Sequence, residues 1–318
     1  YESIDYLPDN SEVERVVTTG NHMAYLKIAE GCDKRCSYCI IPKIRGRFRS
    51  VPMQELLNEA KRLASEGVKE LVLVAQETTL YGKDLTGEKQ LPLLLHELCK
   101  IEGIEWIRLL YCYPEEITDE LIKVIKTEEK VCNYIDMPIQ HSENRILQRM
   151  GRRTSREDLV AVIKKLRKEI PDITIRTTLI TGFPGESQED HEGLMNFVEE
   201  CQFDRLGVFT YSPEEDTLAA TFEDQIDEEV KEDRQADIME LQQEIVFDQA
   251  EDMIGKEVLV MIEGKVADEN AYVGRTYRDA PNVDGLIFVN TDEELMTGDF
   301  AKVKVTGAAE YDLIGELI

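Results

Sequence analysis

Short apolar segments typical of β-strands alternate with segments of helical periodicity through most of the chain. In residues 52–66, for example, Leu56, Ala60 and Leu63 recur at the spacing of a helix face, and Pro52 suits the first turn. The expected strands cover residues 25–29, 70–75, 106–111, 134–137, 174–180 and 205–211, and the expected helices cover 52–66, 93–100, 156–169, 188–200 and a segment from Asp119. Six strands joined by helices predict an α/β fold with a parallel sheet.

Such a sheet, covered by helices on one side and curled, forms a barrel of the TIM type, and we expect a partial barrel of six strands. Active sites of these barrels lie at the carboxyl ends of the strands. Polar residues follow several of the expected strands, in segments 76–79, 140–142, 181–186 and 211–215. Because these strand ends meet at one rim, the sequence predicts a functional site there.

Three cysteines within eight residues, Cys32, Cys36 and Cys39, directly follow the first expected strand. A four-iron, four-sulfur cluster normally binds four thiolates, so a trio would leave one iron open to a small molecule. A structural zinc site is the alternative, but it prefers a closed set of four ligands. The other cysteines stand apart, where free cysteine usually packs into a core: Cys99, Cys112, Cys132 and Cys201.

The cysteine count also bears on the compartment. Seven is an odd number, and no paired spacing suggests a disulfide framework, so a reducing cytoplasm fits best. No apolar run approaches the roughly eighteen residues that span a bilayer, and no leader sequence precedes the first strand. The chain begins with Tyr1 rather than methionine, and we expect it to be a soluble part of something longer.

Acidic residues far outnumber basic ones, with 65 aspartates and glutamates against 37 lysines and arginines and a net charge of −28. This balance weighs against a nucleic-acid surface built on general basicity and favours basic partners. Surplus acid also serves plain solubility, so the charge alone does not decide the partner.

The cysteine loop GCDKRCSYC and the following IIPKIRGRFRS resemble the cluster-binding loop of radical S-adenosylmethionine (SAM) enzymes, and more narrowly that of the methylthiotransferases. The segments MPIQHSENRIL, RMGRRTS and TLITGFPGE are similar to signatures of the same family, and the resemblance runs from about Met23 to the C-terminus. It implies that Cys32, Cys36 and Cys39 hold one [4Fe-4S] cluster, and that the amino and carboxylate groups of SAM chelate the fourth iron.

The resemblance also suggests residues around SAM. Tyr38 would lie against the adenine, and Glu77 would approach the amino group. Arg176 is a candidate for the carboxylate and Gln140 for the ribose, while Gly182 would let the backbone pass beside SAM. No residue is assigned as a catalytic acid, base or nucleophile, because the cofactor supplies the difficult step and the protein orients it.

The composition changes after residue 225. A long acidic helix is expected over 228–252 as a packed connector, with an apolar stripe that begins at Val230. Short alternating strands with glycine- and asparagine-rich turns then predict a small antiparallel barrel, which resembles the TRAM module of methylthiotransferases. The predicted domains are an N-terminal linker, a radical SAM core and a TRAM domain, over residues 1–20, 21–252 and 253–318.

Methylthiotransferases modify either tRNA adenosine or, in the RimO-type branch, the β carbon of an aspartate in protein twelve of the small ribosomal subunit. The expected barrel favours the protein substrate, because residues 254–318 hold 6 basic against 13 acidic residues and would repel RNA. The segments YCYP (111–114) and YSPEE (211–215) resemble the loops of that branch. The prediction is therefore a radical SAM methylthiotransferase, a transferase, that binds a basic ribosomal protein through its acidic barrel.

Two alternatives stay open. A tRNA adenosine methylthiotransferase is supported by a basic run after the trio, although these side chains could equally pair with surrounding acids: Lys43, Arg45, Arg47 and Arg49. A non-catalytic iron–sulfur or zinc protein could instead use the barrel to hold a basic partner.

One departure from the family concerns its N-terminal domain, in which three further cysteines hold a second cluster that supplies sulfur. No cysteine precedes Cys32, and the four scattered ones do not form such a trio. We therefore expect this chain to cleave SAM with an electron donor, but to be impaired in complete methylthiolation.

Overall fold

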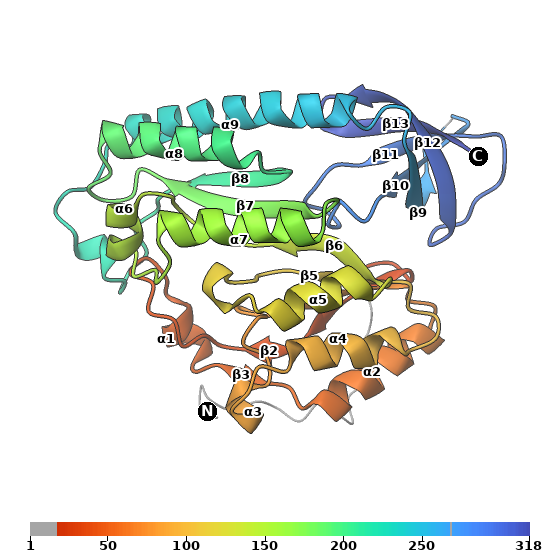
Figure 1. Cartoon of the computed structure of the whole chain (residues 1–318), viewed down its shortest axis with the longest axis horizontal. Coiled ribbons are helices and arrows are strands. Elements are labelled where there is room, and N and C mark those ends of the chain that lie inside the picture. Colours follow the sequence, from red (N-terminus) through yellow and green to blue (C-terminus); the bar gives the residue numbers. More distant parts are fainter. Residues whose placement is uncertain (1–17, 268) are drawn as a thin grey trace.

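Six parallel strands form one curved sheet in the order β1–β4–β5–β6–β7–β8 (Figure 1). The computed structural model describes residues 18–267 and 269–318, so most of the predicted linker over residues 1–20 lies outside the described part. The sheet consists of β1 (Met23–Lys27), β4 (Glu70–Val74), β5 (Trp106–Leu109), β6 (Val131–Asp136), β7 (Thr174–Thr181) and β8 (Arg205–Thr210). The predicted six-stranded partial barrel is confirmed, although β6 begins three residues earlier than the sequence indicated.

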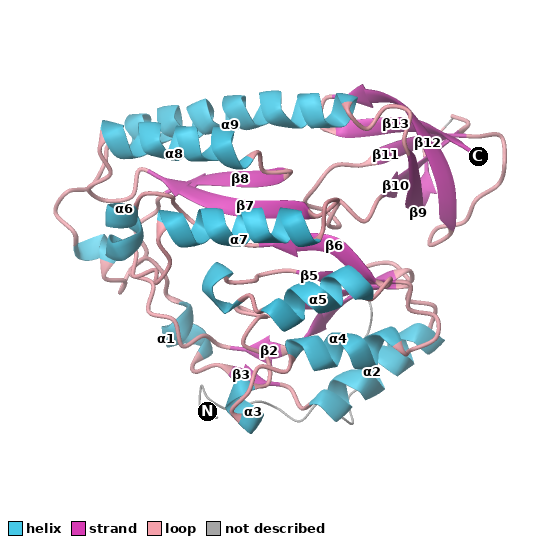
Figure 2. Ribbon diagram, in the orientation of Figure 1, coloured by secondary structure: helices cyan, strands magenta, loops and turns pink. Residues whose placement is uncertain are grey.

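Helices cover the outer face of this sheet (Figure 2). They are α2 (Met53–Ser65), α4 (Leu91–Cys99), α5 (Asp119–Thr127), α7 (Arg156–Glu169), α8 (Gln188–Cys201) and α9 (Glu228–Glu251). Two of them begin with capping boxes, in which Ser155 and Ser187 accept from the backbone N–H three residues ahead. Their apolar faces and the strands enclose the main hydrophobic core. No helix within residues 18–267 and 269–318 is long and apolar enough to span a bilayer.

Helix α9 packs along β8 and α8, as expected for a connector. Ile238, Ile245 and Val246 are buried, whereas Val230, the first residue of the predicted stripe, is 38% exposed. The first turns of α9 instead bury two cations, Lys231 and Arg234, against the ends of the strands.

Several short elements at the carboxyl ends of the strands were not predicted, because they are too short to show a hydrophobic period. They are β2 (Ala29–Glu30), α1 (Ile41–Arg45), β3 (Arg49–Ser50), α3 (Lys83–Thr86), η1 (Pro114–Glu116), α6 (Asn144–Arg149) and η2 (Ala219–Thr221). Strands β2 and β3 pair with each other antiparallel, so residues 31–48 form a loop whose two ends are joined.

The C-terminal strands close into a barrel in the order β10–β11–β13–β12–β9. They are β9 (Glu257–Lys265), β10 (Ala271–Arg275), β11 (Ile287–Asn290), β12 (Phe300–Ala309) and β13 (Asp312–Leu317). The predicted small barrel is confirmed, but β11 and β13 pair parallel while the other pairs are antiparallel. Strand β10 was missed. It contains Gly274 at an irregularity in its pairing with β9, where a glycine masks the strand pattern.

This barrel packs against the amino ends of the sheet strands, at the end opposite the cysteine loop (Figure 1). Trp106 at the start of β5 meets Phe300 of β12 edge to face, with ring centroids 4.9 Å apart. Tyr134 of β6 donates a hydrogen bond from its hydroxyl to Asp284 at 2.7 Å. The barrel therefore closes one end of the concave face and leaves the carboxyl rim to the cysteine loop.

Candidate functional site

The cysteine loop is held in shape by its backbone. Gly31 has a positive φ of 80°, and a Cβ there would lie 2.1 Å from the carbonyl oxygen of Arg47, so only glycine fits. Its N–H donates to Oε1 of Gln76 at 2.7 Å, which joins the loop to the end of β4. The N–H of Cys32 donates to the carbonyl of Gly46 at 3.2 Å and closes the loop further.

The loop brings the three predicted cluster ligands together. Cys32 and Cys36 are buried, Cys39 is half-buried, and none forms a disulfide. Burial raises the pKa of Cys32 to about 11, and the neighbouring thiols Cys36 and Cys39 raise it further, so the sulfurs lie within electrostatic reach of one another. Such thiols stay protonated until a metal displaces the proton.

The thiols are not arranged for a single ion. In the part of the chain that the structure describes, no three His, Cys, Asp or Glu side chains are placed to hold one metal ion. A four-iron cluster does not require them to converge, because each thiolate binds a different iron. Three thiols in one closed loop therefore fit a [4Fe-4S] cluster.

A second loop, residues 149–152, supports the cysteine loop from α6. The N–H of Ser37 donates to the carbonyl of Met150 at 2.9 Å, and its hydroxyl donates to the carbonyl of Arg149 at 2.7 Å. Gly151 approaches so closely that a Cβ there would lie 2.7 Å from the carbonyl oxygen of Arg35. The RMGRRTS segment thus contributes directly to the shape of the predicted cluster site.

Glu77 lies buried beside the trio. Its Oε1 accepts from the hydroxyl of Thr79, while Oε2 has no hydrogen-bond partner among residues 18–267 and 269–318. Burial raises the pKa of Glu77 to about 7, although Lys34, whose Nζ lies 3.5 Å from Oε2, opposes this shift. A buried carboxyl group whose Oε2 accepts no hydrogen bond from the described residues is suited to bind an ammonium group, as predicted for SAM.

Lys34, between Cys32 and Cys36, connects this carboxyl group to two further acids. Its Nζ lies 3.0 Å from Oε1 of Glu115 and 2.8 Å from Oε1 of Glu116, both in η1. Three carboxylates therefore surround one buried ammonium group next to the predicted cluster. The sequence does not reveal this cluster of charges, because η1 lies about eighty residues from Lys34 along the chain.

Tyr38 packs against an aromatic group at the end of β7. Its ring centroid lies 6.5 Å from that of Phe183, which in turn meets Tyr211 at 5.3 Å and Phe222 at 6.2 Å. Burial raises the pKa of Tyr38, so its hydroxyl stays protonated. This apolar wall beside the cysteine loop is suited to an adenine ring.

Gln140 and Gly182 also lie at this rim. The N–H of Gln140 donates to the carbonyl of Thr178 at 2.9 Å, and Gln140 accepts from the N–H of Ile180 at 2.7 Å, so residue 140 extends the sheet beside β7. Gly182 has a φ of 65°, and a Cβ there would lie 2.2 Å from Cγ of Lys231. The close packing of α9 therefore requires a glycine at position 182, whether or not SAM binds beside it.

Arg176 lies apart from the other predicted SAM residues. It is near the amino end of β7, where its Nη1 lies 2.9 Å from Oδ1 of Asp136 and its Nε lies 3.4 Å from Oδ1 of Asp284 in the barrel. Its guanidinium group is engaged between the sheet and the barrel, so its predicted contact with the SAM carboxylate stays a prediction without support from the geometry.

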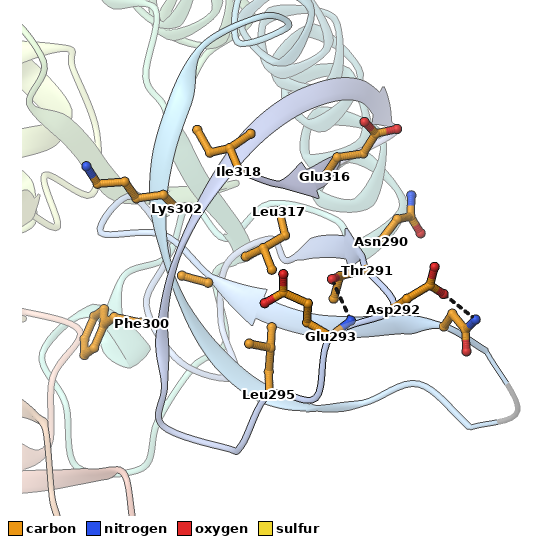
Figure 3. A pocket seen from close by; sticks show the side chains of 12 residues that line it. Asn290, Thr291, Asp292, Glu293, Leu295, Phe300, Lys302, Glu316, Leu317 and Ile318 are labelled. Atoms are coloured by element: carbon orange, nitrogen blue, oxygen red, sulfur yellow. Dashed lines mark hydrogen bonds between the residues drawn. The ribbon is translucent and has the colours of Figure 1, made fainter.

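A separate pocket of about 740 Å³ opens on the C-terminal barrel (Figure 3). Glu293 and Glu316 line it, and neither has an ion-pair partner in the described residues. Asp292 accepts a hydrogen bond from the amide of Asn270 at 2.8 Å, and Lys302 is the basic residue of the lining. The pocket is therefore acidic, in line with the charge of the segment.

Comparison with known proteins identifies both parts of the chain. The radical SAM superfamily matches residues 26–198, and the TRAM domain matches residues 254–318. Among solved structures, coproporphyrinogen III oxidase (HemN) from Escherichia coli superposes with a TM-score of 0.52 at 16% identity, covering 90% of this chain and 68% of that one. At this identity the match shows the radical SAM fold alone.

Curated relatives are much more similar. The ribosomal protein uS12 methylthiotransferase RimO of Lachnoclostridium phytofermentans is 62% identical over 315 residues, which are 99% of this chain and 71% of that protein. RimO of Clostridium perfringens is 55% identical, covering 95% of this chain and 67% of the relative. RimO of Clostridium botulinum is 52% identical, covering 96% and 68%. The chain therefore belongs to the ribosomal protein uS12 methylthiotransferase RimO family of radical SAM transferases.

Proposed function

We propose that this chain binds a [4Fe-4S] cluster and SAM at the carboxyl rim and transfers a methylthio group to the β carbon of an aspartate in ribosomal protein uS12. The observation that carries the proposal is the closed loop 31–48, which places Cys32, Cys36 and Cys39 beside the buried carboxyl group of Glu77. Family membership favours this substrate over tRNA adenosine and over a non-catalytic role.

The chain's own residues would bind and orient the cofactor. The three thiolates would hold the cluster, and Tyr38 would support the adenine. Oε2 of Glu77, which accepts no hydrogen bond from the described residues, would bind the SAM ammonium group. When bound, the cluster and SAM supply one-electron chemistry that protein side chains lack. The buried aromatic wall behind Tyr38 would exclude water from the reacting atoms.

The cofactor part of the proposal is tested by anaerobic reconstitution. The chain should retain about four irons, as a cluster with three thiolate ligands requires, and should form deoxyadenosine from SAM once reduced. Cys36→Ala should lose the iron, whereas Cys201→Ala, which changes a core cysteine of α8, should retain it. Retention of about two irons, or no deoxyadenosine, would count against the proposal.

The substrate part is tested by mass spectrometry of uS12 after incubation with the full-length enzyme. We expect an added methylthio group on one aspartate. An unmodified uS12 beside a modified tRNA would replace the protein substrate by the tRNA.

We further propose that the second cluster of the family is not built from the remaining cysteines of this sequence. Each is packed in or against the hydrophobic core from a different element: Cys99, Cys112, Cys132 and Cys201. The sulfur for insertion would then come from a cluster bound outside residues 18–318. A chain that holds only the cluster of the cysteine trio should cleave SAM without completing methylthiolation.

The acidic barrel is the proposed contact for the basic ribosomal protein. Glu293 and Glu316 in the pocket of Figure 3 have charges available for lysine or arginine. Binding to uS12 should weaken steeply with salt, and binding to tRNA should be weak throughout a salt series. Because the proposed substrate is a ribosomal protein, we expect this activity in the cytoplasm. The reaction would also require an electron donor there.

A further inference from the structure

The structure buries four arginine side chains in its described part, and three of them have carboxylate partners. Two contact Glu70 and one contacts Glu186. These three are Arg108, Arg275 and Arg234. The fourth, Arg152, lies in the loop after α6 and has no carboxylate ion pair in the part of the chain that the structure describes.

Arg152 is 8% exposed and has few contacts. Its Nη2 donates to the carbonyl of Pro138 at 2.9 Å, and its guanidinium carbon lies 4.4 Å from the ring centroid of Tyr113. Nε and Nη1 have no hydrogen-bond partner among the residues described. A buried charge with two unused donors is unfavourable, so the site is suited to an anion that the chain itself does not supply.

The position of Arg152 points to the anion. The preceding residue, Gly151, packs on the cysteine loop next to Cys36: a Cβ there would lie 2.7 Å from the carbonyl oxygen of Arg35 and 3.5 Å from Cα of Cys36. Burial alone would lower the pKa of Arg152, but Tyr38, Tyr113, Cys36 and Glu115 raise it. The guanidinium group therefore lies within electrostatic reach of the Cys36 sulfur and of the Glu115 carboxylate, although it forms no ion pair with Glu115.

Lys34 is the other buried cation next to the trio, but its charge is already balanced. It has ion pairs with Glu77, Glu115 and Glu116. Arg152, which has no ion pair among the described residues, is therefore the better placed of the two cations to serve a ligand of the cysteine loop.

We propose that Arg152 donates hydrogen bonds to sulfur atoms of the bound cluster next to the Cys36 thiolate. These hydrogen bonds would stabilise the reduced state of the cluster. The proposal rests on the proposed function, because it requires the cluster. A cluster held by three thiolates is anionic, and its negative charge grows by one when it accepts an electron from the reductant. A fixed positive charge beside a cluster sulfur should therefore raise the reduction potential.

The test compares reconstituted wild type with R152Q, R152K and the control R153Q, which changes the exposed neighbouring arginine. Iron content and the cluster midpoint potential are measured by an EPR-monitored titration with dithionite. At the wild-type midpoint potential, the reduced fraction of R152Q should fall at least fivefold. R152K should recover part of this loss, and R153Q should match wild type.

Two further measurements separate the possible outcomes. SAM affinity of the oxidised cluster form should change little, since a fall in affinity at an unchanged potential would assign Arg152 to the SAM carboxylate and overturn the proposal. The metal-free R152Q chain should melt no lower than metal-free wild type, and a clear fall in Tm would mean a merely structural arginine. A wild type that retains no four-iron cluster would instead refute the proposed function.

Discussion

Glu70, at the start of β4, lies between two buried guanidinium groups. Its Oε1 is 2.8 Å from Nε of Arg108 in the sheet, and its Oε2 is 2.6 Å from Nη2 of Arg275 in the TRAM barrel. All three side chains are fully buried. At the scale of single residues, this fully buried triad joins the two parts of the chain.

Glu70→Gln should therefore destabilise the folded chain by about 3–5 kcal/mol, because it leaves the buried guanidinium group of Arg108 without a carboxylate and leaves that of Arg275 with Glu263 alone. Urea unfolding measures the change. Glu97→Gln, which removes an exposed partner of Lys100, should leave stability unchanged. Equal effects of the two variants would show that the buried triad contributes nothing particular.

Glu70 also predicts an acid-sensitive contribution to stability. Burial alone would raise the pKa of Glu70, but Arg108 and Arg275 outweigh burial and hold the pKa below its usual value of 4.5. The folded state thus favours the carboxylate, so the stabilisation is present above about pH 4.5 and is lost as the pH falls through the folded pKa. Over the acid range, urea midpoints of wild type should fall more than those of E70Q; parallel curves would contradict this assignment.

Several site residues could be predicted because they follow strands directly. Glu77 and Gly182 lie at the rim for that reason, and Tyr38 follows the first strand within the trio loop. Arg176 lies early in β7, where it forms ion pairs with Asp136 and Asp284, and its contact with SAM stays a prediction. Arg152 was within a quoted signature, but only the packing of its loop shows that it is buried without a carboxylate.

At the scale of elements, long amphipathic segments were predictable and short connecting ones were not. The helix from Arg156 and the helix from Gln188 begin at serine caps that the sequence displays, and both extend as expected. The β2–β3 pair contains only four residues, and its pairing depends on a turn through residues 31–48 that no period reveals. Strand β10 was not predicted because Gly274 interrupts its strand pattern.

The contact between α9 and the end of β7 gives a prediction of its own. Gly182→Ala should destabilise the chain by about 1–3 kcal/mol, because the new methyl group would overlap the Lys231 side chain at 2.2 Å. The double variant with Lys231→Ala should recover part of this loss in a double-mutant cycle, measured by urea unfolding. If G182A weakens SAM binding at unchanged stability, the glycine serves the cofactor and the packing argument is wrong.

At the scale of the whole molecule, the TRAM barrel completes the core of the sheet. Residues of β1, β4, β5 and β6 share one hydrophobic cluster with Met261 and Ala280 of the barrel region. Trp106, the single tryptophan of the sequence, belongs to this cluster and is 6% exposed. Its fluorescence therefore reports on the contact between the two parts.

We expect both parts to unfold together. In a urea titration, the red shift of Trp106 fluorescence should coincide with the loss of far-UV circular dichroism, because separation would expose a buried core. Phe300→Leu, which removes the edge-to-face partner, should lower both midpoints equally. A fluorescence change well ahead of the circular dichroism change would show that the barrel detaches first.

Helix α9 extends from the carboxyl rim to the C-terminal barrel, so its length gives the distance between these two ends of the molecule. It starts at the rim, where Lys231 contacts Gly182, and its last turns pack into the barrel core through Ala250. Its 24 residues correspond to about 36 Å at 1.5 Å per residue. An extended peptide needs about eleven residues to cover that span. A peptide of fewer residues around the target aspartate would thus reach the rim alone. A substrate that extends over about 36 Å would contact both ends, so the gain from the second contact would depend on the length of the substrate.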